Sequence, residues 1–198
     1  MRRRTAFVGS VSTGLLLAVA VGLGSNAAGT GEGTTHRPVR GNSSVEEVRL
    51  QTGRDVYYVG ESFAGLSLTA VERRTDEAGY VSLLYGDCQA DDHSGCALPL
   101  EIQTWPSCAR NLALYDGADP FAPTPERVLV RGVPAGILDE GRQVELQTGN
   151  STIVIFGESR ALVARAAASL RGVDNPARPG DPLRPPVAGA VEGELDCP

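Results

Sequence analysis

The fold is decided by residues 127–172, which read RVLVRGVPAGILDEGRQVELQTGNSTIVIFGESRALVARAAASLRG. Apolar and polar residues alternate along Arg142–Gln147, as in a strand with one buried and one solvated face. Thr152–Phe156 is apolar on both faces, which suits a central strand, and the intervening TGNS has turn composition. We therefore expect a hairpin here, preceded by strands at Arg127–Val130 and Pro134–Leu138.

An amphipathic helix is expected directly after the hairpin, over Glu158–Arg171. Its apolar stripe recurs at helical spacing, with arginines lying off it, and consists of Leu162, Val163, Ala166, Ala167 and Leu170. We expect this stripe to pack on Ile153 and Ile155, or on their neighbours Val154 and Phe156. The stretch thus predicts a small α+β core.

Four further strands are expected upstream, at Asp55–Val59, Leu66–Val71, Tyr80–Tyr85 and Leu98–Ile102. Pro99 lacks a backbone donor, which favours an edge position for the last of them. A short helix is expected within Ser107–Leu114. Residues 51–172 are therefore predicted to form a single α+β domain, in which one C-terminal helix packs on a small, mostly antiparallel sheet.

Charge narrows the range of partners. The net charge is −6, and the 18 basic residues are all arginine. An excess of acidic residues disfavours a general affinity for nucleic acid or for anionic lipid surfaces. We expect no nucleic-acid partner.

The N-terminus reads as a targeting segment over residues 1–27. Arg2, Arg3 and Arg4 form a positive start, residues 6–24 are uncharged and mostly apolar, and small residues lead up to Ala27. A signal peptide cleaved after Ala27 is the first interpretation, and an uncleaved membrane anchor over residues 6–24 is the alternative. Both predict an extracytoplasmic protein, secreted or anchored, that touches the membrane only through this segment.

Two segments are expected to lack a core of their own. Residues 28–50 are rich in Gly, Thr and Ser and are interpreted as a linker. Residues 173–198 are acidic and rich in proline, so they are expected to form a disordered tail.

The four cysteines suggest one disulfide by their position along the chain. Cys88 and Cys96 lie between the expected strands Tyr80–Tyr85 and Leu98–Ile102, at the same end of a presumed antiparallel pair. We therefore expect a Cys88–Cys96 bridge. Cys108 and Cys197 can pair with each other or with another chain, and the sequence leaves both options open.

Catalytic signatures are weak. Ser62 lies in Gly-Glu-Ser-Phe-Ala, one residue short of a nucleophile elbow, and Asp87 and His93 occur in a cysteine-flanked loop without metal-site spacing. A glycine-bounded turn and a solvated loop are the preferred interpretations. No catalytic residue, metal site or cofactor is predicted.

Aromatic residues concentrate between positions 57 and 121. Tyrosine and tryptophan are typical both of carbohydrate- or protein-contact surfaces and of β-sheet cores. Tyr57, Tyr85 and Trp105 are the candidate ligand-binding residues, although the core interpretation is preferred.

Three motifs stand out along residues 55–171: Tyr57-Tyr58-Val59-Gly60, Tyr85-Gly86-Asp87-Cys88 and Arg131-Gly132-Val133-Pro134-Ala135. Through these motifs the stretch resembles a group of uncharacterised exported bacterial proteins. The closing strand–strand–helix also resembles the final half of extracytoplasmic domains in membrane-anchored bacterial proteins of unknown function. Neither resemblance implies an activity or a site.

Two functional hypotheses follow. The first is an extracytoplasmic binding or interaction domain, associated with the cell envelope and its unidentified partners. The alternative is a secreted hydrolase or metal-dependent enzyme that uses Ser62, His93 or Asp87.

Overall fold

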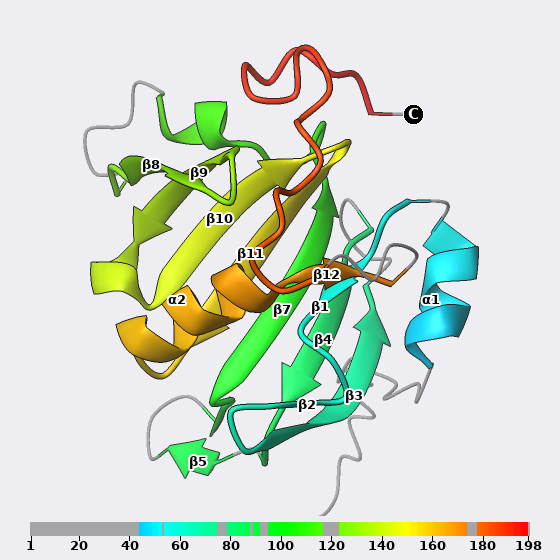
Figure 1. The fold of residues 1–198 in the computed structure, drawn as a ribbon, viewed down its shortest axis with the longest axis vertical. Coiled ribbons are helices and arrows are strands. Elements are labelled where there is room, and N and C mark those ends of the chain that lie inside the picture. The colour runs from blue at the N-terminus through cyan, green and yellow to red at the C-terminus, as the bar shows by residue number, and fades with distance from the viewer. Residues whose placement is uncertain are drawn as a thin grey trace, which may run out of the picture. The chain divides into compact units, whose positions relative to one another are not determined.

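Eight strands form one antiparallel sheet in the computed structural model of this protein (Figure 1). The structure describes residues 44–52, 54–74, 79–87, 89–91, 95–116, 123–173 and 178–197. The chain divides into two compact units, 1–37 and 38–198, and every described residue belongs to the second. The targeting segment therefore lies outside the described residues. Among the helices that the structure describes, none has the length and apolar character needed to cross a membrane.

The elements in chain order are α1 (Val45–Thr52), β1 (Tyr57–Tyr58), β2 (Ser62–Phe63), β3 (Leu66–Arg73), β4 (Val81–Tyr85), β5 (Gln89–Asp91), β6 (Gly95–Ala97), β7 (Leu100–Pro106), η1 (Leu112–Tyr115), β8 (Glu126–Val130), β9 (Val133–Leu138), η2 (Asp139–Gly141), β10 (Gln143–Thr148), β11 (Ser151–Gly157), α2 (Arg160–Ser169) and β12 (Arg171–Gly172). The large sheet has the order β2-β3-β4-β7-β11-β10-β9-β8. Two separate two-stranded pairs, β1–β12 and β5–β6, complete the β structure of the described residues.

The predicted hairpin is confirmed. Strands β10 and β11 pair antiparallel from Gln143↔Phe156 to Thr148↔Ser151, which leaves a two-residue turn at Gly149 and Asn150. Gly149 adopts a φ of +56°, a conformation that glycine reaches without steric cost. The α+β class and the mostly antiparallel sheet are confirmed with it.

The helix packs on the sheet through the predicted stripe. Ser159 caps its N-terminus by accepting a hydrogen bond from the Leu162 backbone N–H at 3.3 Å. Ala166 and Leu170 are completely buried in the cluster that contains Ile153 and Ile155. The helix is shorter than expected at both ends: it starts after the Ser159 cap and ends at Ser169, so Leu170 is its C-cap. Arg171 continues instead into β12, which pairs with β1.

The expected edge strand is in fact central. Strand β7 lies between β4 and β11 and runs from Leu100 to Pro106. The prediction was wrong because Pro99 stands one residue before the strand, where its missing N–H removes no ladder bond. Its carbonyl accepts the Glu158 N–H at 3.0 Å and so ties the strand to the start of α2.

Part of the expected linker is helical. Ser44 and Glu47 cap α1 reciprocally, with Glu47 N–H donating to Ser44 Oγ at 3.1 Å and Ser44 N–H donating to Glu47 Oε2 at 2.9 Å. Val48 is completely buried in the core cluster, so the helix is attached to the domain by packing as well.

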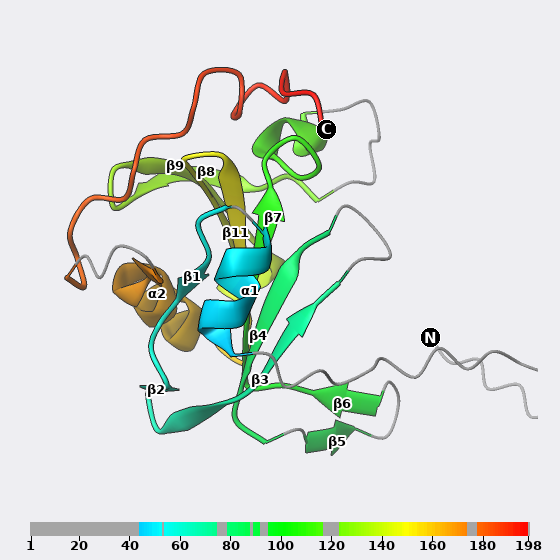
Figure 2. The same cartoon turned by 90° about the vertical axis from the view of Figure 1, so that its right-hand side faces the viewer.

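The disordered tail is not confirmed. Residues 178–197 run along one end of the sheet (Figure 2), and Gly149 N–H donates to Pro185 O at 3.2 Å while Val187 N–H donates to Gly149 O at 2.8 Å. A disulfide joins Cys197 to Cys108, in the turn after β7. Composition alone misled the prediction, since backbone hydrogen bonds, one covalent bridge and the buried side chains of Leu183 and Ala190 hold the segment.

The predicted Cys88–Cys96 bridge involves Cys88, which lies outside the described residues, and it remains a prediction. The antiparallel β4–β7 pairing on which it was based is confirmed.

Candidate functional site

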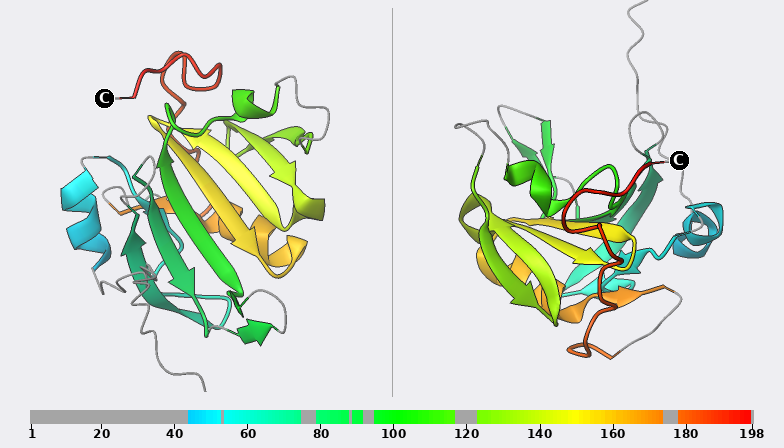
Figure 3. Two further views of the ribbon diagram at one scale, coloured as in Figure 1. Left: turned by 180° about the vertical axis from the view of Figure 1, so that it is seen from behind. Right: turned by 90° about the horizontal axis from the view of Figure 1, so that it is seen from above.

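The sheet has two unlike faces, because side chains alternate along each strand. The face covered by α2 receives residues such as Leu100, Ile102 and Ile155. We call the opposite side the helix-free face; on its three central strands it consists of Glu101, Gln103, Trp105, Gln143, Glu145, Gln147, Thr152, Val154 and Phe156. No described helix crosses its middle, and η1 lies over one end (Figure 3, left).

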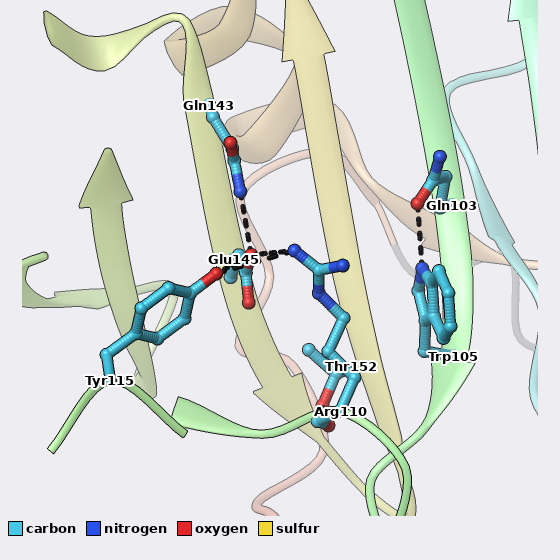
Figure 4. Close-up of polar contacts among 7 residues, drawn as sticks. All are labelled: Gln103, Trp105, Arg110, Tyr115, Gln143, Glu145 and Thr152. Atoms are coloured by element: carbon cyan, nitrogen blue, oxygen red, sulfur yellow. Dashed lines mark hydrogen bonds and ion pairs between the residues drawn. The ribbon is translucent and has the colours of Figure 1, made fainter. Parts of the chain in front are cut away.

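A buried carboxylate stands at the centre of the polar contacts on this face. Glu145 is completely buried. Its Oε1 accepts hydrogen bonds from Gln143 Nε2 at 2.7 Å, from the Tyr115 hydroxyl at 2.6 Å and from Arg110 Nη2 (Figure 4). A carboxylate out of contact with water needs such donors and a cation, and Arg110 supplies the cation.

Arg110 is positioned by the turn that follows β7. Its backbone N–H donates to Pro106 O at 3.1 Å, and its carbonyl accepts the Thr152 hydroxyl at 2.5 Å. From this turn the side chain reaches across β11 toward Glu145 (Figure 4). The guanidinium carbon lies 5.3 Å from the centre of the Trp105 ring, a cation–π contact.

Trp105 links this ion pair to the neighbouring strands. Its ring stacks on Tyr80 with centroids 3.9 Å apart and planes 15° apart. Its indole N–H donates to Gln103 Oε1 at 2.7 Å. Glu101 Oε1 in turn accepts Gln103 Nε2 at 2.7 Å and the Ser82 hydroxyl at 2.5 Å.

These contacts form a row of fixed side chains that crosses the strands rather than following one of them. We call Tyr80, Trp105, Arg110, Glu145 and Tyr115 the cross-strand row. Tyr80 and Tyr115 are half-buried, and 23% of the Arg110 side chain is exposed to solvent. The neighbouring Gln143 is half-buried as well, so a ligand can reach part of the row and its border.

The contact with Glu145 shifts the pKa of two members of the row, Arg110 and Tyr115. Burial alone lowers the pKa of Arg110, but the hydrogen bond and charge of Glu145 outweigh it, and the pKa is raised above its usual value. Burial raises the pKa of Tyr115 to about 12, and the hydrogen bond to Glu145 adds to the effect. The arginine is therefore charged and the tyrosine neutral.

The three aromatic candidates from the sequence occupy different places. Tyr57 is 6% exposed and shares a hydrogen bond of 3.2 Å with Thr148, and Tyr85 is completely buried, with its hydroxyl accepting the Val59 N–H at 3.3 Å. Both belong to the core under α2. Trp105 belongs to the cross-strand row but is itself only 8% exposed.

The residues of the enzyme alternative lie at a corner of the sheet. Ser62 pairs with Ser67, whose carbonyl accepts the Gly86 N–H at 2.8 Å, next to Asp87. Ser62 and Asp87 are exposed, and His93 lies outside the described residues. Within the part of the chain that the structure describes, no group of three or more His, Cys, Asp or Glu side chains has a geometry that suits a metal ion.

The sequence alone did not indicate that Tyr80, Arg110, Tyr115 and Glu145 form one cluster. The available signal was a polar residue at each outward position of β10, Gln143, Glu145 and Gln147, between apolar neighbours. A run of amides around a carboxylate on a predicted strand indicates a polar network, although it does not identify the partners.

Comparison with known proteins gives no relative: no family model, no curated protein and no solved structure matches the chain.

Proposed function

We propose that this chain is an exported domain that binds cell-envelope polysaccharide through the helix-free face. The observation that carries the proposal is the cross-strand row, a set of planar and charged side chains fixed in place on the side of the sheet away from α2.

Its rigidity supports a binding role. Trp105 is held by a stacked ring, a cation–π contact and a hydrogen bond, and Glu145 by three donors. Side chains held in this way lose little conformational entropy when a ligand arrives, which favours affinity. For stability alone, an apolar pair in place of Arg110 and Glu145 would serve equally well, so the ion pair is not explained by folding stability.

Its chemistry supports a saccharide ligand. Tyr80 and Tyr115 offer partly exposed aromatic surface, while Gln143, Glu101 and Arg110 offer amide, carboxylate and guanidinium groups around it. Flat apolar faces bordered by hydrogen-bonding groups are what a sugar ring, with its own apolar face and rim of hydroxyls, requires.

Export is supported by two independent features. The N-terminal segment has the composition of a signal peptide or anchor. The Cys108–Cys197 disulfide is of the kind that persists in oxidising compartments outside the cytoplasm.

The proposal is tested by co-sedimentation with insoluble bacterial cell-wall polysaccharide. The protein is the compact unit that begins at Pro38, because all described contacts lie within it. Arg110→Lys keeps the charge but removes the planar guanidinium fork, and we expect it to weaken binding about tenfold. Arg165→Lys makes the same change on the exposed side of α2 and serves as the matched control.

Equal binding by both variants and the wild type would place the ligand elsewhere on the domain. No sedimentation of any of the three, with the fold intact by circular dichroism, would reject polysaccharide as the ligand.

A further inference from the structure

The two edges of the large sheet differ in how they are protected. At one edge, the two-residue strand β2 pairs with the start of β3, at Leu66 and Ser67. Beyond that point β3 carries a bulge between Leu68 and Ala70, and α1 packs beside it. Charged side chains follow at its end, where Glu72 pairs with Arg74 at 3.9 Å. Bulges, charges and covering helices are the usual devices that stop an edge strand from pairing with another chain.

At the other edge, β8 has neither a bulge nor a covering helix among the described residues, and of its two charged residues, Glu126 and Arg127, the arginine is paired with Asp116. Its sequence Glu-Arg-Val-Leu-Val contains no proline or lysine, and it pairs only with β9, in regular register from Glu126↔Ile137 to Val130↔Val133. No described backbone group bonds to its outer side, and the C-terminal segment meets the chain just beyond it, where Leu183 N–H donates to Arg131 O. Leu129 is 74% exposed.

The sequence of β8 is complementary to itself in one register. In a symmetric antiparallel pair centred on Val128, Arg127 of one copy faces Leu129 of the other, and Glu126 faces Val130. Centring the pair on Arg127 or on Leu129 instead places Arg127 opposite another arginine, its own copy or Arg131. Like charges directly opposite each other destabilise a strand pair, so the register centred on Val128 is preferred.

We propose that two copies of this chain associate through β8, edge to edge, and join their sheets into one. The exposed Leu129 then packs against the aliphatic stem of the partner's arginine, and the free backbone groups of β8 find partners. Both helix-free faces lie on the same side of the joined sheet. The inference is independent of what that face binds.

The experiment is sedimentation equilibrium of the unit from Pro38 to Pro198 over a range of concentrations. A five-residue strand forms a small interface, so we expect a reversible dimer with a dissociation constant roughly in the micromolar range. Leu129→Arg places like charges opposite each other twice per dimer and is expected to raise that constant about tenfold or more. Leu50→Arg changes an equally exposed leucine, 68% against 74%, on α1 and is expected to leave it unchanged.

A charge reversal checks the register itself. Combining Leu129→Arg with Arg127→Glu restores opposite charges across the pair, and we expect it to restore the dimer. A monomer at all concentrations, or a dimer that Leu50→Arg weakens as much as Leu129→Arg does, overturns the proposal. Leu50 and Leu129 are exposed, so the monomer should keep its fold in both single variants. Arg127 Nη2 pairs with Asp116 at 2.5 Å and donates to Leu112 O at 2.8 Å, so Arg127→Glu alone is the control for the loss of these contacts, and circular dichroism checks the fold of the double variant.

Discussion

The two faces of the sheet are formed by alternate residues of the same central strands, yet the side chains on each face are held in place in different ways. Under α2, Ile102, Leu146 and Ile155 exclude water by apolar packing alone. On the helix-free face, Glu145 is just as buried but is held by directed bonds from an arginine, a tyrosine and an amide. Apolar packing tolerates exchange of similar side chains, whereas a directed network fails when one member is lost. The difference indicates that one face supplies stability and the other holds a defined arrangement.

The largest expected effect comes from breaking the ion pair. Arg110→Ala leaves the Glu145 carboxylate buried without a cation, and we expect a loss of about 3–5 kcal/mol in the free energy of unfolding at neutral pH. Urea unfolding measures it. The double variant Arg110→Met with Glu145→Leu should recover most of the loss, because it removes both charges together. If Arg110→Ala were as stable as the wild type, the proposed difference between the two faces would be contradicted.

Truncation on the covered face should cost somewhat less. Leu170→Ala removes a completely buried side chain from the contact between α2 and the sheet, at an expected cost of about 2–4 kcal/mol. Leu170→Met keeps the volume and should lose much less, as apolar packing requires. Denaturant midpoints at constant slope give both values, and a Leu170→Ala protein as stable as its parent would contradict the packing.

The Cys108–Cys197 disulfide gives a further test of the difference between the two faces, because it attaches the C-terminal segment to the helix-free side. Cys197→Ser should destabilise the domain by about 2–4 kcal/mol, since the bridge closes a loop with a sequence separation of 89. The Ala190 carbonyl of the segment accepts a hydrogen bond from Gln147 Nε2 at 2.9 Å, so amide exchange should rise mainly at Ser107–Asn111 and at Gln147. A rise in amide exchange confined to α2 would show that the C-terminal segment does not pack on the helix-free side.

The smallest expected effect is a difference between two tyrosines. Tyr85 under α2 and Tyr115 on the helix-free face both have a pKa raised to about 12, chiefly by burial, but only Tyr115 gains from Glu145. Each contributes stability that is present below the ordinary tyrosine pKa of about 10 and is lost as the pH rises through about 12. Glu145→Gln should lower the pKa of Tyr115 alone. Absorbance titration at alkaline pH measures both tyrosine pKa values, and Tyr115→Phe identifies the signal of Tyr115. Equal pKa shifts of Tyr85 and Tyr115 in Glu145→Gln would contradict the prediction.

The covered face is predictable from the sequence because its signals are local. The helical stripe of Leu162 and Ala166 lies within α2 and is confirmed, and Leu170 is buried beside it as the C-cap. The alternation of Arg142–Gln147 correctly predicts a strand, but the face expected to be solvated is buried, because Glu145 and Gln147 are both completely buried. The position of β7 was mispredicted, because the effect of Pro99 depends on whether the strand begins before or after it.

The side-chain contacts on the helix-free face cannot be predicted from local sequence patterns. Arg110 meets Glu145, and Tyr80 meets Trp105, only after the order and register of four strands are set. The order of the C-terminal segment likewise depends on the Cys108–Cys197 bridge, which the sequence did not distinguish from a bridge to another chain.

The most direct test of the proposed role of the helix-free face uses Trp105, the only tryptophan in the chain and a member of the cross-strand row. Its fluorescence is followed while soluble cell-wall polysaccharide fragments are added to the unit that begins at Pro38. We predict a saturable change in emission, shifted to about tenfold higher concentration by Arg110→Lys and not shifted by Arg165→Lys. Saturable binding detected by calorimetry with no change in Trp105 emission would contradict the assignment of this face as the binding surface.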